Sequence, residues 1–312
     1  MVHVAQSALS HHIAALEDEL GVSLLDRTGR GVTPTEAGER LYRHAQELLR
    51  QADDTKVAVS TGTIELSGLV SIGMPLSLVM GLALPILTAV RRAHPGIRLR
   101  IHEETADTVF NWMHSGRLNV GIVFDDASME GLDTTPLFEE RLFVVVAPAS
   151  GLAHRQSIEL AEIADMPLIV PSAGKGVRPY LELALAKAGL ALQAPAAEVN
   201  SVTLMKQAAA VGIAPTVLGW APIDAEIRAG SLKALEIVNP SICRTALMCA
   251  QPASQRSQST DRVLSILARV TQERVASGDW RGVRLPDSPW PEAAATARPR
   301  RASTRAIASR DS

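Results

Sequence analysis

Side chains able to hydrogen-bond to the bases and phosphates of a nucleic acid gather at the start of one predicted helix. Ser7 is a good N-cap, and apolar residues recur behind it at helical spacing, at Leu9, Ile13, Leu16 and Leu20. This pattern predicts a helix over residues 7–20 that ends at Gly21. The polar side chains at or near its first turn are Gln6, Ser7, Ser10, His11 and His12. Glutamine can pair with adenine and a helix N-terminus favours phosphate, although capping or plain exposure would also explain these residues.

A short basic turn follows this helix at residues 26–34. It contains Gly29 and Gly31, and two glycines so close together indicate an exposed hairpin or tight turn. Its polar residues include Arg27, Arg30 and Thr33. An arginine in such a turn could contact phosphates or a minor groove, and the alternative is an ordinary surface side chain.

A long proline-free helix is predicted behind the turn, over residues 35–60. Its small and medium side chains repeat every seven residues in two rows, at Leu41, Leu48 and Thr55 and at Ala45, Ala52 and Val59. Such a seam is typical of a helix that pairs with a second copy, and the alternative is a helix packed on its own domain. We expect a linker helix that dimerises the chain over residues 35–65.

From residue 66 onward, predicted strands alternate with predicted helices. This alternation indicates a mainly parallel α/β sheet covered on both faces, and its length favours two lobes. We expect lobe I to comprise residues 66–146 and 249–285, and lobe II residues 147–248. Residues 286–312 are rich in Ala, Arg, Pro and Ser without periodicity, which predicts a disordered tail.

Polar residues follow several of these strands and open the next helix, where a cleft between two lobes would lie. The candidates for binding a small effector there are Ser77, Thr105, Ser172, Lys175, Ser201 and Thr203. Helix N-termini bind carboxylates and phosphates, so the predicted ligand is anionic, with Lys175 or Arg178 supplying charge. The alternative for each hydroxyl is helix capping or turn formation.

Composition excludes several classes of protein. The 31 Lys and Arg against 33 Asp and Glu give a net charge of −2, which excludes nucleic-acid binding by bulk positive charge. With 2 cysteines, a disulfide framework or four-cysteine zinc site is excluded, and adjacent His11 and His12 face different ways. No catalytic signature is present, so we expect neither an enzyme, a metal nor a cofactor. Acid pairs such as Glu139–Glu140 are expected to be solvated.

The order of residues in the first part of the chain resembles that of the LysR-type transcriptional regulators. The matching stretches are AQSALSHHI at residues 5–13, the leucines that follow, and RGVTPTEAG at residues 30–38. Within that family, the wing and LSGLVSIG at residues 66–73 look most like the nitrogen assimilation control type. The resemblance implies an α/β fold class with a partial winged helix-turn-helix over residues 1–34, a long linker helix and a two-lobed periplasmic-binding-protein-like effector domain.

The resemblance also implies partners and a location. Such a protein binds promoter DNA and a small-molecule effector, contacts RNA polymerase and assembles as a homodimer or homotetramer. No secretory signal opens the chain, and the apolar stretch at residues 76–90 is too short and too broken to span a membrane, so a cytoplasmic protein is expected.

Family members begin roughly 25 residues earlier, before the first helix of the helix-turn-helix. Either the start of the chain is assigned too late, or the gene is truncated. The second explanation gives the alternative function, a truncated effector-binding and dimerising protein that does not bind DNA by itself.

Overall fold

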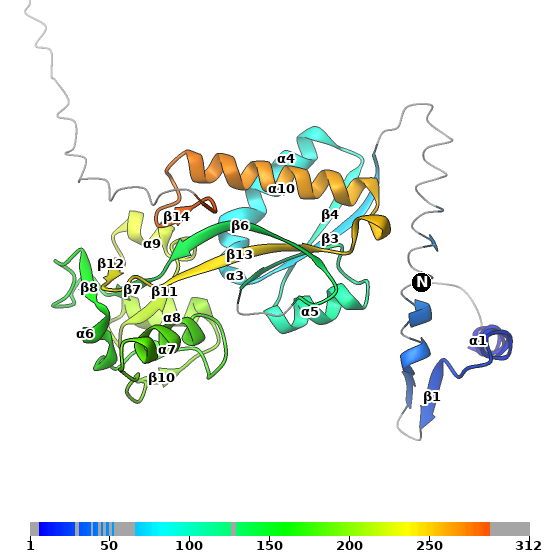
Figure 1. Ribbon diagram of the computed structural model, residues 1–312, viewed down its shortest axis with the longest axis horizontal. Coiled ribbons are helices and arrows are strands. Elements are labelled where there is room, and N and C mark those ends of the chain that lie inside the picture. Colours follow the sequence, from blue (N-terminus) through cyan, green and yellow to red (C-terminus); the bar gives the residue numbers. More distant parts are fainter. Residues whose placement is uncertain are drawn as a thin grey trace, which may run out of the picture.

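The computed structural model describes residues 6–28, 31–38, 40–42, 45, 48–49, 52, 66–125 and 129–287. The described residues between 6 and 34 form a helix, α1 (Gln6–Leu20), and a two-stranded hairpin, β1 (Leu25–Thr28) and β2 (Gly31–Pro34) (Figure 1). The strands pair antiparallel, with Asp26 opposite Thr33. The predicted helix and basic hairpin are therefore confirmed, and Gly21 ends the helix with a φ of +69°.

Side-chain hydrogen bonds fix the turn between α1 and the hairpin. The Glu17 carboxylate accepts from the backbone N–H groups of Leu24 and Leu25, at 2.6 and 3.1 Å. Thr35 then caps the next helix, because its hydroxyl accepts from the N–H of Gly38 at 3.0 Å. All the described residues between 36 and 52 are helical, in agreement with the first half of the predicted linker helix. Its second half and the predicted tail from residue 288 lie outside the described residues.

Lobe I is built on a mixed six-stranded sheet with the order β14-β6-β13-β5-β3-β4. Its strands are β3 (Gly68–Met74), β4 (Ile97–Glu103), β5 (Val120–Phe124), β6 (Asp133–Arg141), β13 (Cys243–Ala250) and β14 (Val283–Arg284). Strand β3 is parallel to β4 and β5, whereas β13 is antiparallel to β5 and β6. The residues of β5 are all buried, since helices cover both faces of the sheet.

The helices of lobe I divide between the two faces of its sheet (Figure 1). They are α3 (Leu76–Leu78), η1 (Val79–Ala83), α4 (Leu84–Ala93), α5 (Ala106–His114), η2 (Ala253–Gln255) and α10 (Gln258–Ala276). By length and composition alone, residues 76–93 would pass as one membrane-spanning helix. A core helix passes the same test, and here a π-helical segment interrupts the run while Leu82, Ile86 and Val90 are buried against the sheet.

Lobe II has a second mixed six-stranded sheet with the order β10-β9-β11-β7-β12-β8. Its strands are β7 (Phe143–Val146), β8 (Ser157–Glu159), β9 (Ile169–Val170), β10 (Ala197–Glu198), β11 (Thr216–Leu218) and β12 (Lys233–Val238). Its helices are α6 (Leu160–Ala164), α7 (Arg178–Lys187), α8 (Val202–Ala210) and α9 (Asp224–Ala229). In both lobes the sheets are mixed, which corrects the expectation of mainly parallel strands.

The strand pairing also moves the predicted lobe boundaries. The chain crosses between the sheets twice, from β6 into β7 near residue 142 and from β12 into β13 between residues 239 and 242. Strand β7 pairs with β11 and β12 in lobe II, and β13 already belongs to lobe I from Cys243. The predicted boundaries at residues 146 and 248 are therefore wrong. All four residues of β7 are buried, and an apolar run of that kind does not reveal which sheet it joins.

Candidate effector-binding cleft and DNA-binding surface

A cavity of about 640 Å³ lies between the two lobes. Of the six residues predicted to bind an effector, five line it, namely Ser77, Thr105, Lys175, Ser201 and Thr203. They come from both lobes, because α3 and α5 belong to lobe I whereas the loop before α7 and the start of α8 belong to lobe II. The sequence thus predicted that the loops and helix starts that follow the strands of both lobes meet at one cavity.

Helix N-termini supply part of the polar lining. Thr105 is the N-cap of α5 and its hydroxyl accepts from the N–H of Thr108 at 3.3 Å; Ser201 caps α8 in the same way through the N–H of Leu204. The capping alternative therefore holds for these two residues, while both also face the cavity. The hydroxyls of Ser77 and Thr203 have no hydrogen-bond partner within the described residues, so they are free to bind a ligand.

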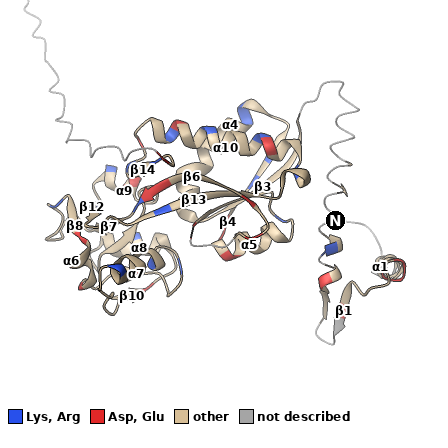
Figure 2. Ribbon diagram, viewed as in Figure 1, with Lys and Arg blue, Asp and Glu red and all other residues tan. Residues whose placement is uncertain are grey.

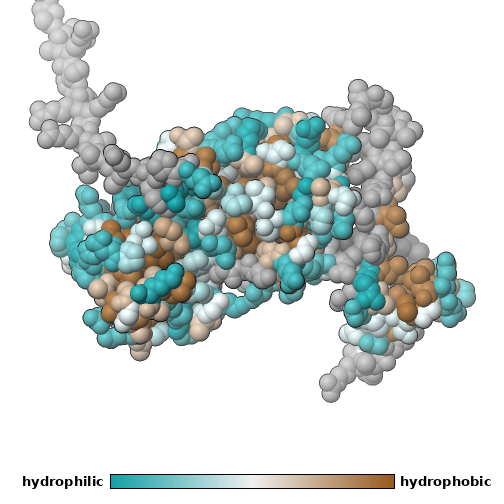
Figure 3. Space-filling view, viewed as in Figure 1, coloured by the Kyte–Doolittle hydropathy of each residue, from teal (hydrophilic) through white to brown (hydrophobic). Residues whose placement is uncertain are grey.

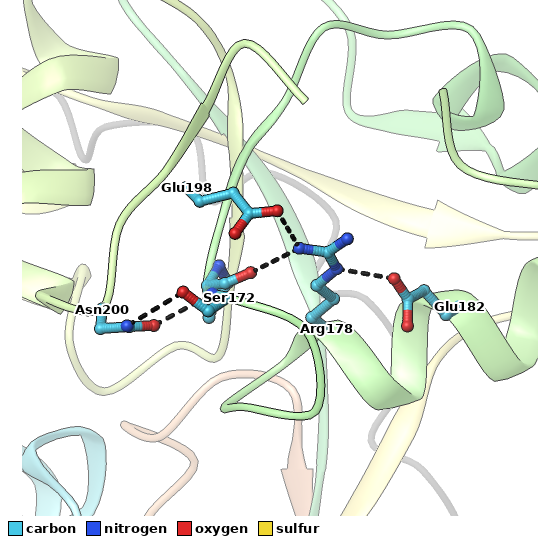
Figure 4. A network of polar contacts seen from close by, with 6 residues as sticks. Ser172, Arg178, Glu182, Glu198 and Asn200 are labelled. Atoms are coloured by element: carbon cyan, nitrogen blue, oxygen red, sulfur yellow. Dashed lines mark hydrogen bonds and ion pairs between the residues drawn. The ribbon is translucent and has the colours of Figure 1, made fainter. Parts of the chain in front are cut away.

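The loop at residues 171–177 is held in place by a network of polar contacts (Figure 4). Asn200 donates to the Ser172 hydroxyl at 3.1 Å and accepts from the Ser172 backbone N–H at 3.0 Å. Ser172 is absent from the cavity lining, so it holds the loop rather than facing a ligand.

Arg178 completes the network from the start of α7 (Figure 4). Its guanidinium binds Glu182 through Nε and Glu198 through Nη1, at 2.6 and 2.7 Å, and donates to the carbonyl of Pro171. The hydrogen bonds to Glu198 and Glu182 raise the pKa of Arg178 above its ordinary value. Arg178 is thus occupied by protein carboxylates, which corrects the expectation that it supplies free positive charge for a ligand.

Two polar contacts connect the lobes across the cleft. Lys175, in the loop of lobe II, forms an ion pair with Asp107 of α5. Both side chains are more than half exposed, so this pair contributes little stability and is easily exchanged for a ligand contact. Tyr180 of α7 donates to the carboxylate of Asp125, which follows β5, at 2.7 Å.

A buried ion pair at the cleft was not anticipated from the sequence. Arg244 of β13 and Glu140 of β6 are adjacent in the sheet and are 5% and 2% exposed. Arg244 Nε donates to Glu140 Oε1 at 2.7 Å, Nη2 forms an ion pair with the same oxygen at 2.6 Å, and Arg244 also lines the cavity. The prediction that Glu139 and Glu140 are solvated is therefore wrong: Glu140 is buried and Glu139 pairs with Arg284. A single charge inside the otherwise apolar β13 was the available signal, but its partner is 104 residues away.

The predicted DNA-binding residues lie on α1 and the hairpin. Gln6 and Ser7 begin α1, and His11 and His12 are exposed on it, with Ser10 partly exposed. In the hairpin, Thr33 is exposed on β2 and Arg27 belongs to β1, while Arg30 lies outside the described residues. Charges of both signs are interspersed over the two lobes (Figure 2). The predicted residues that are described thus share a small helix–hairpin unit.

Apolar side chains are also exposed on this unit, and Figure 3 shows them gathered beside α1. Leu9 is 55% exposed and Leu16 is 41% exposed. Ile13 and Leu16 line a cavity together with Leu41 and Tyr42 of the following helix and with Trp112 of α5.

Comparison with known proteins settles the family. Residues 64–272 match the model of the LysR substrate binding domain, and residues 1–39 match that of the bacterial regulatory helix-turn-helix protein, lysR family. The chain belongs to the LysR family of transcriptional regulators. As a LysR-type regulator it combines a DNA-binding helix-turn-helix region with a two-lobed effector domain, as the resemblance implied.

Relatives of this LysR-type regulator include the nitrogen assimilation regulatory protein nac of Klebsiella aerogenes, which is 33% identical over 70% of both chains. The same protein of Escherichia coli K12 is 34% identical over the same shares. The predicted likeness to the nitrogen assimilation control type is thereby confirmed.

Solved structures show the same fold. A full-length OxyR variant of Pseudomonas aeruginosa superposes with a TM-score of 0.68 at 23% identity, covering 86% of each chain. Full-length BenM superposes with a TM-score of 0.58 at 23% identity, covering 89% of this chain and 90% of its own. Within the described residues of the LysR-type regulator, no group of three His, Cys, Asp or Glu side chains could hold a metal ion.

Proposed function

We propose that this LysR-type regulator controls transcription in response to a small anionic effector bound between its lobes. The observation that carries the proposal is that five predicted polar residues from both lobes line one cavity of about 640 Å³. A ligand held by both lobes favours one relative arrangement of them, and such a change can reach the DNA-binding region through the linker.

The negative charge of the proposed effector rests on the positive groups of the lining. The N-termini of α5 and α8 and the Lys175 ammonium are positive, and the open hydroxyls of Ser77 and Thr203 can donate to an anion. On this proposal the cleft binds its effector without chemical conversion, and the protein is not an enzyme.

DNA contact is assigned to the start of α1 and to the hairpin. We place Gln6, Ser7, Ser10, His11 and His12 toward a major groove, and Arg27, Arg30 and Thr33 toward the backbone or a minor groove. Because the chain carries a net charge of −2, we expect few phosphate contacts and weak nonspecific binding.

Assembly as a homodimer is supported by the helical residues behind the hairpin. Leu48 and Leu49 are 65% and 68% exposed there, as expected for the surface of a helix that pairs with a second copy. Two dimers would make the homotetramer. The proposed site of action is promoter DNA in the cytoplasm, where the protein contacts RNA polymerase.

The test is selection of binding sites from a random DNA pool by the purified full chain. We expect one enriched sequence with two related half-sites, as a dimer requires. Replacing Arg27 with alanine should weaken binding to all selected sequences. It should also make the slope of log affinity against log salt concentration shallower, by roughly the amount expected for one phosphate contact. Replacing Arg92, an exposed arginine of α4, is the matched control and should leave DNA binding unchanged.

The two outcomes separate the alternatives. Enrichment that depends on Arg27 supports a regulator that binds DNA by itself. Absence of any enriched sequence, or unchanged salt dependence in Arg27→Ala, would overturn the assignment of DNA contact. In vitro transcription from a selected site then tests the contact with RNA polymerase.

A further inference from the structure

Arg244 has hydrogen-bonding capacity that the protein does not use. A guanidinium carries five N–H donors; Arg244 donates one from Nε to Glu140 Oε1, and its Nη2 forms an ion pair with the same oxygen. Nη1 has no hydrogen-bond partner within the part of the chain that the structure describes, although Arg244 is only 5% exposed. The side chain lines the interlobe cavity, so the cavity is the space into which its remaining donors can bind.

The guanidinium is also fixed in position. The ring of Phe124 lies against it, with 3.4 Å between Cζ and the ring centroid, and Phe124 lines the same cavity. The Glu140 carboxylate binds one edge of the Arg244 guanidinium. That carboxylate is itself closely packed against Gly219, because a Cβ added at Gly219 would lie 2.6 Å from both carboxylate oxygens. A guanidinium that is already held in one orientation loses little conformational entropy when it binds a ligand.

Arg178 of α7 shows how a guanidinium in this protein binds two carboxylates. Arg178 binds one carboxylate through Nε and a second through Nη1. Arg244 binds its first carboxylate through Nε and Nη2 and leaves Nη1 open. Arg178 therefore binds two carboxylates, whereas Arg244 binds only one. A carboxylate on a ligand could bind Nη1 of Arg244 as Glu198 binds Nη1 of Arg178.

The rest of the lining limits the charge of that ligand. Three acidic residues line the cavity, Glu103, Glu104 and Asp107, against two basic ones, Lys175 and Arg244, which are both already paired. No ion pair or hydrogen bond engages the carboxylates of Glu103 or Glu104 within the described residues. A second negative charge on the ligand would face them, whereas Met205, Leu218 and Val202 can contact an apolar body.

We infer that Arg244 is the anchor of the effector site and that it binds the carboxylate of a small monocarboxylate with an apolar body. This inference rests on the proposed interlobe effector site and names its ligand class and its central residue. Glu140 and Phe124 act as positioning residues, because they hold the guanidinium rather than contacting the ligand.

The test uses the full chain and two simple monocarboxylates, hexanoate and phenylacetate, titrated to about 10 mM by ligand-observed NMR and calorimetry. The neutral amides of the same two acids and the dicarboxylate adipate are the comparison ligands. We expect at least one monocarboxylate to bind, and its amide and adipate to bind about tenfold more weakly or not at all.

The deciding variant is the double substitution Glu140→Gln with Arg244→Gln. It leaves the net charge unchanged and removes both members of the buried pair, so no unpaired charge is left inside. We expect about a tenfold or greater loss of monocarboxylate affinity with the thermal unfolding transition retained. Arg98→Gln, an exposed arginine of β4, is the control for long-range charge and should bind as the wild type does.

If the double variant is unfolded, Arg244→Lys is tested in its place, because it keeps the positive charge and removes the planar guanidinium. We expect this variant to bind the monocarboxylate no better than its amide. No binding of either monocarboxylate to the wild type would overturn the inference, and so would binding that survives in the folded double variant. Neither result touches the selection of DNA sequences, so a failure of the anchor is distinguishable from a failure of the proposed regulator.

Discussion

Tyr180 donates a 2.7 Å hydrogen bond to Asp125, and this contact joins α7 of lobe II to the end of β5 in lobe I. The same carboxylate oxygen of Asp125 accepts from the backbone N–H of Thr245 at 3.1 Å, beside Arg244 in β13. The contact therefore links both lobes to the strand that carries the proposed anchor. It is placed to respond when the lobes move relative to one another.

Replacing Tyr180 with phenylalanine should remove this link between the lobes. We expect the free energy of unfolding to fall by about 1 kcal/mol, the usual net value of one hydrogen bond. A double-mutant cycle with Asp125→Ala, measured by urea unfolding, should give a coupling energy of about 0.5 kcal/mol or more. Additive effects of the two substitutions would show that the contact does not hold the lobes together.

Gly219 is expected to tolerate no side chain. An added methyl group would lie 2.6 Å from both oxygens of Glu140, which is buried and paired with Arg244. Gly219→Ala should therefore lower the free energy of unfolding by about 1–3 kcal/mol, as overpacking does in other cores. Gly151→Ala is the matched control, because nothing lies within 4 Å of its added methyl group. Equal stability of the two variants in urea unfolding would contradict the close approach at Gly219.

Glu17 should stabilise the turn that leads into the hairpin. Its carboxylate accepts from the N–H groups of Leu24 and Leu25, and Glu17→Ala would leave both without that partner. We expect faster amide hydrogen exchange at these two residues, corresponding to about 1 kcal/mol or more of local stability, and weaker DNA binding. Glu19→Ala, an exposed acid on the same helix, should change neither. Unchanged exchange at Leu24 in Glu17→Ala would argue against the role of Glu17.

Stability at acidic pH should depend on Glu162. The hydrogen bonds from Arg155, and then the backbone N–H of Glu159, lower the pKa of Glu162 from 4.5 to about 2. Because the folded pKa lies below the unfolded value, the stabilisation is present above about pH 4.5 and is lost as the pH falls toward about 2. Glu162→Gln should make unfolding less dependent on pH in this range, measured in urea at about pH 6 and about pH 3. Glu130→Gln, another exposed glutamate, serves as the control, and identical pH profiles for wild type and Glu162→Gln would contradict the prediction.

Much of the fold and part of the site follow from local sequence patterns. The spacing of Leu9, Ile13, Leu16 and Leu20 predicted α1, and the continuous apolar run at residues 120–124 predicted β5. Ser201 was expected where a strand ends and a helix begins, and there it lines the cavity. These features depend on neighbours in the chain, so the sequence alone determines them.

Only the tertiary structure decided which strands share a sheet and which charges meet. Strand β7 joins lobe II although its residues are buried on both sides, and no local pattern distinguishes the two sheets. Glu140 looked like a solvated acid until β6 placed it beside Arg244. Their pairing depends on strand register over more than 100 residues of sequence separation, and burial of both charges is tolerated only because they meet. The sequence therefore determined the elements and the polar ends of the helices, whereas the order and register of the strands decided which charges meet beside the cavity.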